Sequence, residues 1–373
     1  MVQYIECYPE YQKFEEFIKL LLQILQLSFI PRNALKGYEK FIFPLLELYC
    51  FTSSVFTILY YEQDLMIFII RVLPTVGFLQ LLTKSLSVLA NTKQLNVLFL
   101  FIREAYQAHQ VDYVTDSARI HLKRSLGIIK LITGILFSVN FVAGLGLMSY
   151  FVYIDSMAFA VPGVLHFPKA NLFYHHIHQF FVMQISIIII MIPDSILISI
   201  GFYFIAILNI FKDILNYFDS IDLKNKRQFL IQVHKFHCDI LDKFSIFSEV
   251  FYYTFTVQIA TSVVFMMFIF FILQTDGGLA FFPLLLAIFG QFGAVCVFGE
   301  LIYSKTEKLS IELYLTNWYE LGLEEQKILL MMLYMTQKTF GLKAAGMYGI
   351  NVKMFIEVIK ASVSFLTILY TLS

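Results

Sequence analysis

The polar residues whose spacing stands out lie on the last apolar segment of the chain. At 3.6 residues per turn they form one stripe, made of Lys353, Glu357, Lys360, Ser364, Thr367 and Thr371. Charges and hydroxyls in such a row are typical of one wall of a water-filled path. Because one helix cannot enclose a pore, this interpretation requires several copies around an axis. Two alternatives remain open: hydroxyls bonded to the carbonyl one turn back, or small residues at a helix contact.

Two aliphatic residues, Ile368 and Leu372, stand beside the hydroxyl row near the chain end. A ring of such side chains closes a pore by excluding water from it. In a pore of this kind, Ile368 and Leu372 would form the gate, and Thr371, Thr367 and Ser364 would lie on the adjoining pore wall.

The histidines offer weaker signals for chemistry. Four of them cluster between two apolar segments: His166, His175, His176 and His178. Only Asp155, at the edge of that stretch, accompanies them, which is too little for a metal site. His234 and His237 have the spacing of a packed cytoplasmic helix. Since the sequence contains no nucleophile elbow, phosphate loop, dinucleotide fingerprint or zinc-protease motif, we expect no enzyme activity, cofactor or metal.

The composition is that of an all-α membrane protein. Of the 373 residues, 59% are hydrophobic and 14% charged, against about 25% charged in soluble domains. Apolar stretches of about 20 residues without strict alternation predict helices that cross the bilayer. We expect seven of these spans, at roughly 41–60, 65–88, 126–151, 180–208, 250–274, 280–303 and 348–372. A shorter stretch, 17–30, is expected to be an interfacial or packed helix rather than a span.

The basic residues orient these spans. With a cytoplasmic N-terminus, every Lys and Arg outside the spans except Lys169 falls on the inner side. The positive-inside rule favours this arrangement, which places the C-terminus outside the cell. That orientation is the reverse of a G-protein-coupled receptor. The net charge is zero, so nothing indicates a nucleic-acid partner.

One ionisable residue inside a span requires an explanation, because charges are costly in the membrane. Asp194 follows Pro193 in "MIPDSIL", within the fourth expected span. One interpretation is a polar group that is satisfied at a proline kink. The other is a role beside a ligand cavity.

Residues 298–369 resemble the C-terminal third of insect odorant receptors. Their motifs follow one another in the family's order: Tyr314 and Trp318 separated by three residues, Gln337 with Lys338, Ala345 with Gly346, and Lys360, Ser362 and Ser364. Residues 230–262 resemble the family's approach to its fifth span, and Asp194 matches a frequent aspartate. Phe365 departs from the family, which often has Tyr there. Because the 209–249 segment is much shorter than in the family's co-receptor, the chain resembles an odorant-tuning subunit.

The resemblance implies a ligand-gated, non-selective cation channel used in olfactory sensory transduction. Such subunits form heterotetramers with co-receptor subunits, and we expect a multi-pass protein in the plasma membrane of olfactory neuron dendrites. Residues 1–303 would hold the interfacial helix and six spans, and 304–347 a cytoplasmic anchor with Tyr314 and Trp318 at a subunit interface. Residues 348–373 would form the pore-lining seventh helix.

The resemblance also implies a ligand pocket in the outer half of the bundle, between spans two, three, four and six. Pockets of this kind are concave and mostly apolar, so we expect a small volatile organic ligand. The expected lining residues are Ile70, Leu73, Asn140, Gly144, Leu147, Gln184, Ile187, Met191, Phe281 and Phe282. Packing against lipid or core is the alternative for each residue.

Two other classes of protein remain as alternatives. One is a seven-span chemoreceptor that signals through a cytoplasmic partner without its own pore. The other is a transporter, although no inverted repeat or pair of broken helices is evident in the sequence.

Overall fold

The computed structural model describes residues 3–28, 38–60, 65–109, 111–153, 172–218, 220, 223–275, 278–337 and 340–372. Its elements in chain order are α1 (Tyr8–Leu25), η1 (Glu39–Phe41), α3 (Ile42–Tyr60), α4 (Leu65–Ala90), α5 (Thr92–Ala105), α6 (Asp112–Tyr153), α7 (Leu172–Phe218), α8 (Leu223–Val250), α9 (Tyr252–Ile272), η2 (Gly278–Phe281), α10 (Phe282–Tyr314), η3 (Trp318–Glu320), α11 (Leu323–Thr336), β1 (Lys343–Ala344), β2 (Tyr348–Gly349) and α12 (Val352–Leu372). The expected helical architecture is observed, with one short antiparallel strand pair, β1–β2, before the last helix.

Six helical segments among the described residues are long and apolar enough to cross a membrane. They are Glu39–Leu59, Leu65–Ala90, Asp112–Tyr153, His176–Phe218, Tyr252–Ile272 and Gly278–Tyr314, and they coincide with the first six expected spans. The helix α12, whose first turns carry Lys353, Glu357 and Lys360, is not among these six.

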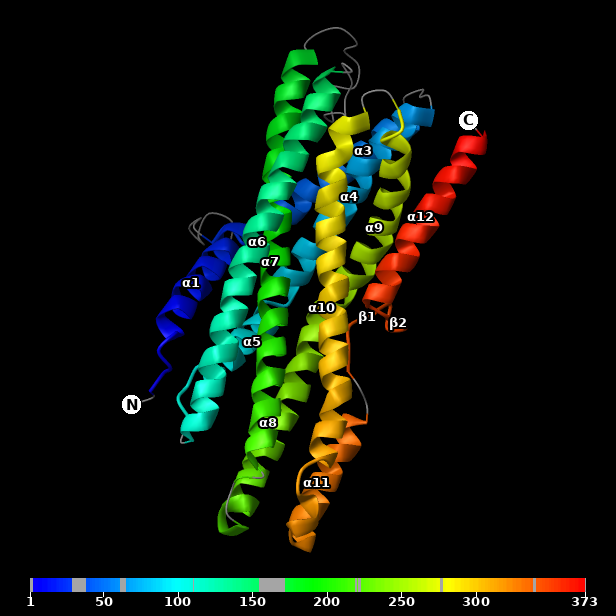
Figure 1. The fold of residues 1–373 in the computed structure, drawn as a ribbon. Coiled ribbons are helices and arrows are strands. Elements are labelled where there is room, and N and C mark those ends of the chain that lie inside the picture. Colours follow the sequence, from blue (N-terminus) through cyan, green and yellow to red (C-terminus); the bar gives the residue numbers. More distant parts are fainter. Residues whose placement is uncertain are drawn as a thin grey trace.

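Two of the helices extend far beyond their expected spans. The helix α6 begins at Asp112, and α7 continues to Phe218, whereas the apolar stretches covered only 126–151 and 180–208. Charged and polar residues continue both helices, so their length exceeds that of the apolar stretch itself. The polar ends reach the lower part of the molecule, where α8 and α11 lie (Figure 1).

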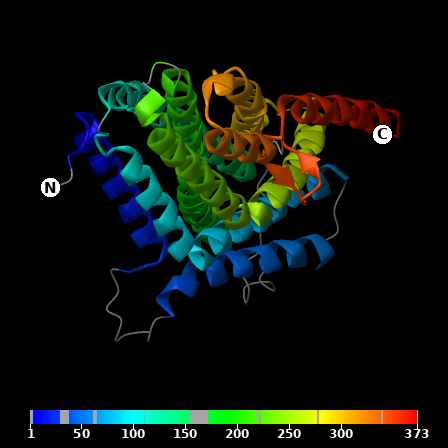
Figure 2. The same cartoon turned by 90° about the horizontal axis from the view of Figure 1, so that it is seen from below.

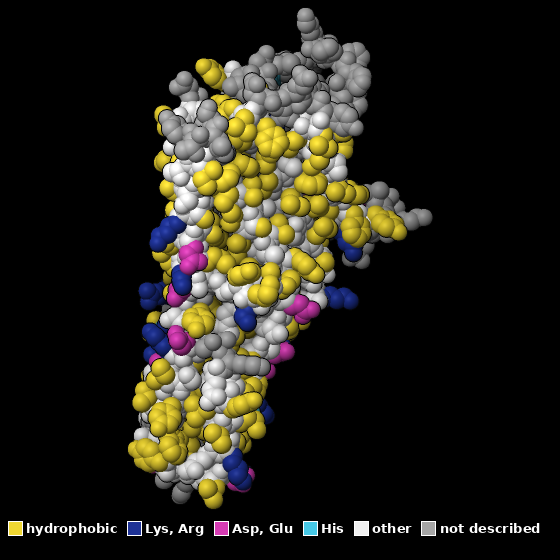
Figure 3. Space-filling view, turned by 90° about the vertical axis from the view of Figure 1, so that its right-hand side faces the viewer, with side chains coloured by type: hydrophobic (Ala, Val, Ile, Leu, Met, Phe, Trp, Pro, Cys, Tyr) yellow, Lys and Arg dark blue, Asp and Glu magenta, His cyan; other side chains and the backbone are white. Residues whose placement is uncertain are grey.

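The surface has two zones along the long axis. On the face that carries α9 and α12, Lys, Arg, Asp and Glu gather over the lower half, and the upper part is mostly hydrophobic (Figure 3). Such a division fits an upper half in lipid and a lower half in water.

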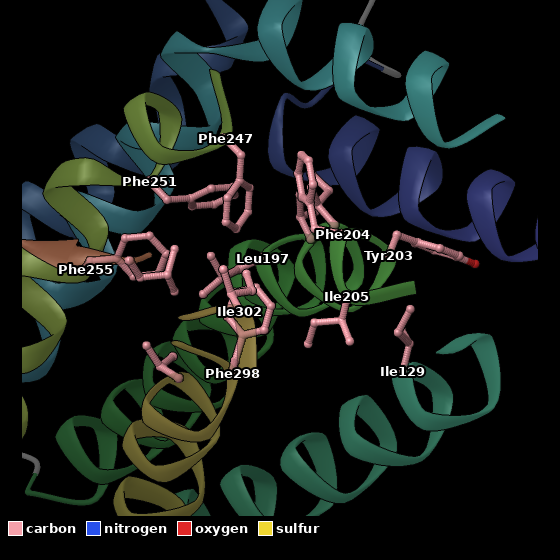
Figure 4. Close-up of a cluster of buried hydrophobic side chains, with 14 of the residues drawn as sticks. Ile129, Leu197, Tyr203, Phe204, Ile205, Phe247, Phe251, Phe255, Phe298 and Ile302 are labelled. Atoms are coloured by element: carbon pink, nitrogen blue, oxygen red, sulfur yellow. The ribbon is translucent and has the colours of Figure 1, made fainter. Parts of the chain in front are cut away.

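The core is held together by an aromatic cluster where α7, α8, α9 and α10 meet. The Phe247 ring lies 5.5 Å from Phe204 of α7 and 6.2 Å from Phe298 of α10, between ring centroids. Phe251 and Phe255 are turned toward the same centre (Figure 4). Gly201 of α7 lets the Phe298 ring approach, because a Cβ there would overlap that ring. The cluster therefore fixes the lower half of the bundle around α7.

The N-terminal helix α1 packs on this bundle along one face, and it begins at Tyr8 and ends at Leu25, whereas 17–30 was expected. Its Tyr11 ring stacks on Tyr106 at 4.5 Å, and the buried Glu15 is paired with Arg103 at 2.6 Å. Phe17 and Leu20 on the opposite face are about half exposed. The helix is amphipathic, which fits the expected place at the membrane interface.

Candidate ligand cavity and pore helix

A cavity of about 120 Å³ lies between α4, α6, α7, α9 and α10. Its wall is mostly aliphatic and aromatic, with Leu73, Phe78, Ile187 and Phe265 among the residues that line it. An apolar cavity of about 150 Å³ in another protein binds benzene. The cavity here is of the same order, so it has room for only a small apolar molecule.

Half of the residues expected to contact a ligand border this cavity. These are Leu73, Asn140, Gly144, Leu147 and Ile187. The cavity also has a fifth wall that the sequence did not indicate, because Phe265 contributes from α9.

The other expected residues lie elsewhere in the bundle. Ile70 is 2% exposed in the core, and Phe281 packs its ring 4.7 Å from Tyr150. Met191 borders a separate groove beside α1, and Phe282 is about half exposed at the start of α10. Gln184 is buried beside the cavity wall, with Nε2 3.1 Å from where a Cβ of Gly144 would stand.

Gly144 gives the cavity part of its shape. A Cβ at this position would overlap Ile187 Cδ1 of α7, and both residues line the cavity. The missing side chain lets Ile187 lean against α6. Any larger residue would push Ile187 aside and change the space for a ligand.

Three polar residues that the sequence did not single out, Gln80 of α4, Ser186 of α7 and Gln291 of α10, also line the cavity. Gln291 Nε2 donates a hydrogen bond to Asp194 Oδ2, and Asp194 Oδ1 lies 2.6 Å from Lys84 Nζ. Asp194 therefore holds a buried ion pair next to the cavity. In the sequence, Gln80, Gln291 and Lys84 could have been noticed only as polar residues within apolar spans, where such residues are unusual.

The helix α12 lies at the edge of the bundle, where it packs mainly on α9 and α10 (Figure 1, Figure 2). Its Ser364, Thr367 and Ile368 side chains are exposed in the single chain. Ser364 Oγ donates to Lys360 O at 3.0 Å, and Thr367 Oγ1 donates to Ser364 O at 2.7 Å. Hydroxyls bonded in this way retain acceptor lone pairs for water. Thr371 and Leu372 belong to the same helix, and their side chains lie outside the described residues.

The polar start of α12 continues this exposed stripe. Lys353 Nζ and Glu357 Oε1 are 3.9 Å apart, and their side chains are 82% and 65% exposed. Lys360 is exposed one turn further along.

Comparison with known proteins decides the family. The sequence profile described as 7tm Odorant receptor matches residues 66–363, which is most of the chain. The chain belongs to the odorant receptor family. A stretch of 95 residues is 28% identical to Odorant receptor 33b of Drosophila melanogaster and spans 26% of this chain and 24% of that receptor.

Solved structures show the same fold. The chain superposes on the insect olfactory receptor OR5 from Machilis hrabei with a TM-score of 0.79 at 16% identity, covering 99% of this chain and 100% of OR5. The same receptor in complex with eugenol gives a TM-score of 0.80 at 14% identity, with the same coverage.

This odorant receptor exposes apolar side chains at the lower ends of α10 and α11. Tyr314 and Trp318, the residues expected at a subunit interface, have ring centroids 6.3 Å apart, although α10 ends between them. Tyr314 is 62% and Tyr334 76% exposed, and they line a groove of about 770 Å³ together with Leu330 and Met331.

Of the two histidines of α8 in this receptor, His237 packs in the core. His237 is fully buried and stacks on Phe211 of α7 with ring centroids 5.3 Å apart. Burial, and then the nearby His234, lower the pKa of His237 to about 4. His234 Nε2 lies 3.9 Å from Cys238 Sγ. Within the part of the chain that the structure describes, no group of three metal-ligating side chains occurs.

Proposed function

We propose that this receptor is the odorant-tuning subunit of an odorant-gated, non-selective cation channel that forms a heterotetramer with co-receptor subunits. The observation that carries the proposal is the uncovered polar stripe on α12, with Ser364 and Thr367 exposed on a helix at the bundle edge. A stripe of this kind is costly against lipid. Several copies around an axis would turn the stripes inward, onto a shared water-filled pore.

In this proposal α12 is the seventh span, the N-terminus is cytoplasmic and the C-terminus lies outside the cell. The pore is closed by Ile368 and Leu372 from each subunit. Residues 1–303 bind the ligand, 304–347 form the cytoplasmic anchor and 348–373 line the pore.

The ligand is a small volatile molecule held in the cavity described above. A receptor of the same fold binds eugenol, and the cavity here has the size and lining for a compact apolar ligand. Binding opens the pore only if the ligand prefers the open arrangement of the bundle.

A contact path leads from the cavity to the pore helix. The cavity is lined by Phe265 of α9 and Gln291 of α10. Phe292, next to Gln291, lies 5.3 Å from Phe355 of α12 between ring centroids. A ligand that shifts α9 or α10 therefore acts directly on the helix that carries the gate.

The anchor supports the assembly of the subunits. The exposed Tyr314, Leu330 and Tyr334 form an apolar patch in the half of the molecule assigned to water. Such a patch, rich in aromatic residues, fits a protein interface.

The proposal is tested by expressing the receptor with and without a co-receptor and recording current under voltage clamp while volatiles are applied. We expect a prompt cation current that persists when G proteins are blocked. Surface expression without current, or current that G-protein block abolishes, would show a receptor that signals through a cytoplasmic partner instead.

A further inference from the structure

The amide of Gln80 lacks a partner at the cavity wall. Gln80 lines the cavity and is 4% exposed, and its Nε2 is buried without a hydrogen-bond partner among the described residues. Buried polar groups in proteins are nearly always hydrogen-bonded. A molecule in the cavity that offers an acceptor would satisfy this donor.

Another amide at the wall, that of Gln291, has a fixed orientation. Asp194 is paired with Lys84, so its carboxylate accepts hydrogen bonds and cannot donate them. Gln291 must therefore turn Nε2 toward Asp194 Oδ2, as observed. The polar atom that Gln291 has left for a molecule in the cavity is Oε1, which is an acceptor.

The two amides belong to one region of the cavity wall. Gln80 precedes Lys84 by one turn on α4, so both side chains lie on the same face of that helix. Lys84 and Gln291 both bind the carboxylate of Asp194. The cavity thus presents a donor from Gln80 and an acceptor from Gln291 within a mostly apolar wall, whose other polar side chains are Asn140 and Ser186.

A hydroxyl group matches this pair with a single oxygen atom, because it accepts one hydrogen bond and donates another. An ether or a ketone satisfies Gln80 alone, and a hydrocarbon satisfies neither amide. We propose that the cavity selects an alcohol or phenol of about benzene size, whose hydroxyl accepts from Gln80 Nε2 and donates to Gln291 Oε1. This inference rests on the proposed role of the cavity as the odorant site.

The test uses phenol, toluene and anisole on the purified complex with co-receptor, with binding measured by ligand-induced thermal shift and, separately, by current in cells. Phenol and toluene have nearly the same shape. We expect phenol to bind about tenfold or more tightly than toluene, with anisole between them, because toluene offers no acceptor to Gln80 Nε2 and no donor to Gln291 Oε1. The Gln80→Leu variant should bring phenol and anisole close to toluene, whereas Gln291→Leu should affect phenol alone.

Gln258→Leu is the matched control. Gln258 of α9 is also a fully buried amide, with both polar atoms unpartnered within the described residues, and it does not line the cavity. This variant should keep the preference for phenol. If toluene binds as well as phenol, or if Gln80→Leu leaves the ratio of the two affinities unchanged, the amides are hydrogen-bonded to water instead. Either result overturns the inference. Binding of phenol without any current would leave the hydroxyl preference intact and contradict the channel function instead.

Discussion

Lys84 Nζ lies 2.6 Å from Asp194 Oδ1, and the two side chains are 1% and 4% exposed. The pair joins α4 to α7, and Gln291 adds α10 through its bond to the same carboxylate. Inside a membrane, each charge lowers the cost of burying the other. Asp194 thus links three walls of the cavity.

Breaking this pair should destabilise the receptor. In Asp194→Asn the charge of Lys84 has no counter-charge, and loss of one partner of a buried pair costs about 3–5 kcal/mol. We expect lower thermal stability and a reduced surface level, measured by melting of the purified complex and by surface labelling. The double change Lys84→Met with Asp194→Leu, which removes both charges, should restore much of the stability.

Asp242→Asn serves as the control for that experiment. Asp242 is 61% exposed and pairs with Lys243 at 2.7 Å, and pairs at the surface contribute about 0–1 kcal/mol. Equal stability of the Asp194→Asn and Asp242→Asn variants would contradict the importance of the buried pair.

A methyl group at Gly144 should impair the response to ligands without preventing folding. The added Cβ would overlap Ile187 Cδ1, so Ile187 must move into the cavity or away from it. We expect Gly144→Ala to shift the half-maximal odorant concentration by about tenfold, since overpacking costs about 1–3 kcal/mol. Gly127→Ala on the same helix meets nothing within 4 Å and should respond like the wild type. If both variants show the same shift, Gly144 does not act through the ligand site.

His237 should make the receptor sensitive to acid. Its pKa is about 4 in the fold and 6.5 ordinarily, so below pH 6.5 the unfolded chain binds a proton that the folded chain excludes. Stability is therefore full above about pH 6.5 and is lost as the pH falls toward 4, by about 1.4 kcal/mol between pH 7.5 and 5.5. Since both ring nitrogens lack partners among the described residues, His237→Phe can keep the stacking on Phe211. The variant should melt with a weaker pH dependence, and an unchanged slope would refute this assignment.

The helices inside the membrane could be predicted because apolar length is a direct signal. The span expected at 65–88 is α4, Leu65–Ala90, and the one expected at 41–60 is α3, Ile42–Tyr60. The continuation of α6 from 126 back to Asp112 carries charged residues, so hydropathy could not separate it from a loop. Six of the seven expected spans coincide with long apolar helices, whereas the polar lower parts of α6 and α7 were not predicted as continuations of those helices.

The candidate site could be predicted where a single residue carries the information. Gly144 was expected in the pocket that the resemblance implies, and it does line the cavity. The partner of Asp194 could not be found, because Lys84 is 110 residues away in the sequence and only tertiary packing joins them. Gln80 and Gln291 could not be identified for the same reason, because only tertiary packing brings them to one cavity wall.

The central claim is that α12 of this chain lines the pore, and it can be tested directly. Thr367→Cys places a thiol on the exposed stripe of α12, and thiols react only where water allows the thiolate to form. Of the four native cysteines, Cys7, Cys50 and Cys296 are buried, so the wild type gives the background. Ile135→Cys, at a position 53% exposed on the apolar part of α6, is the lipid-facing control. We predict that a positively charged thiol reagent blocks the odorant-evoked current of Thr367→Cys and spares Ile135→Cys and the wild type. A Thr367→Cys current that persists after exposure to the reagent would contradict the pore assignment.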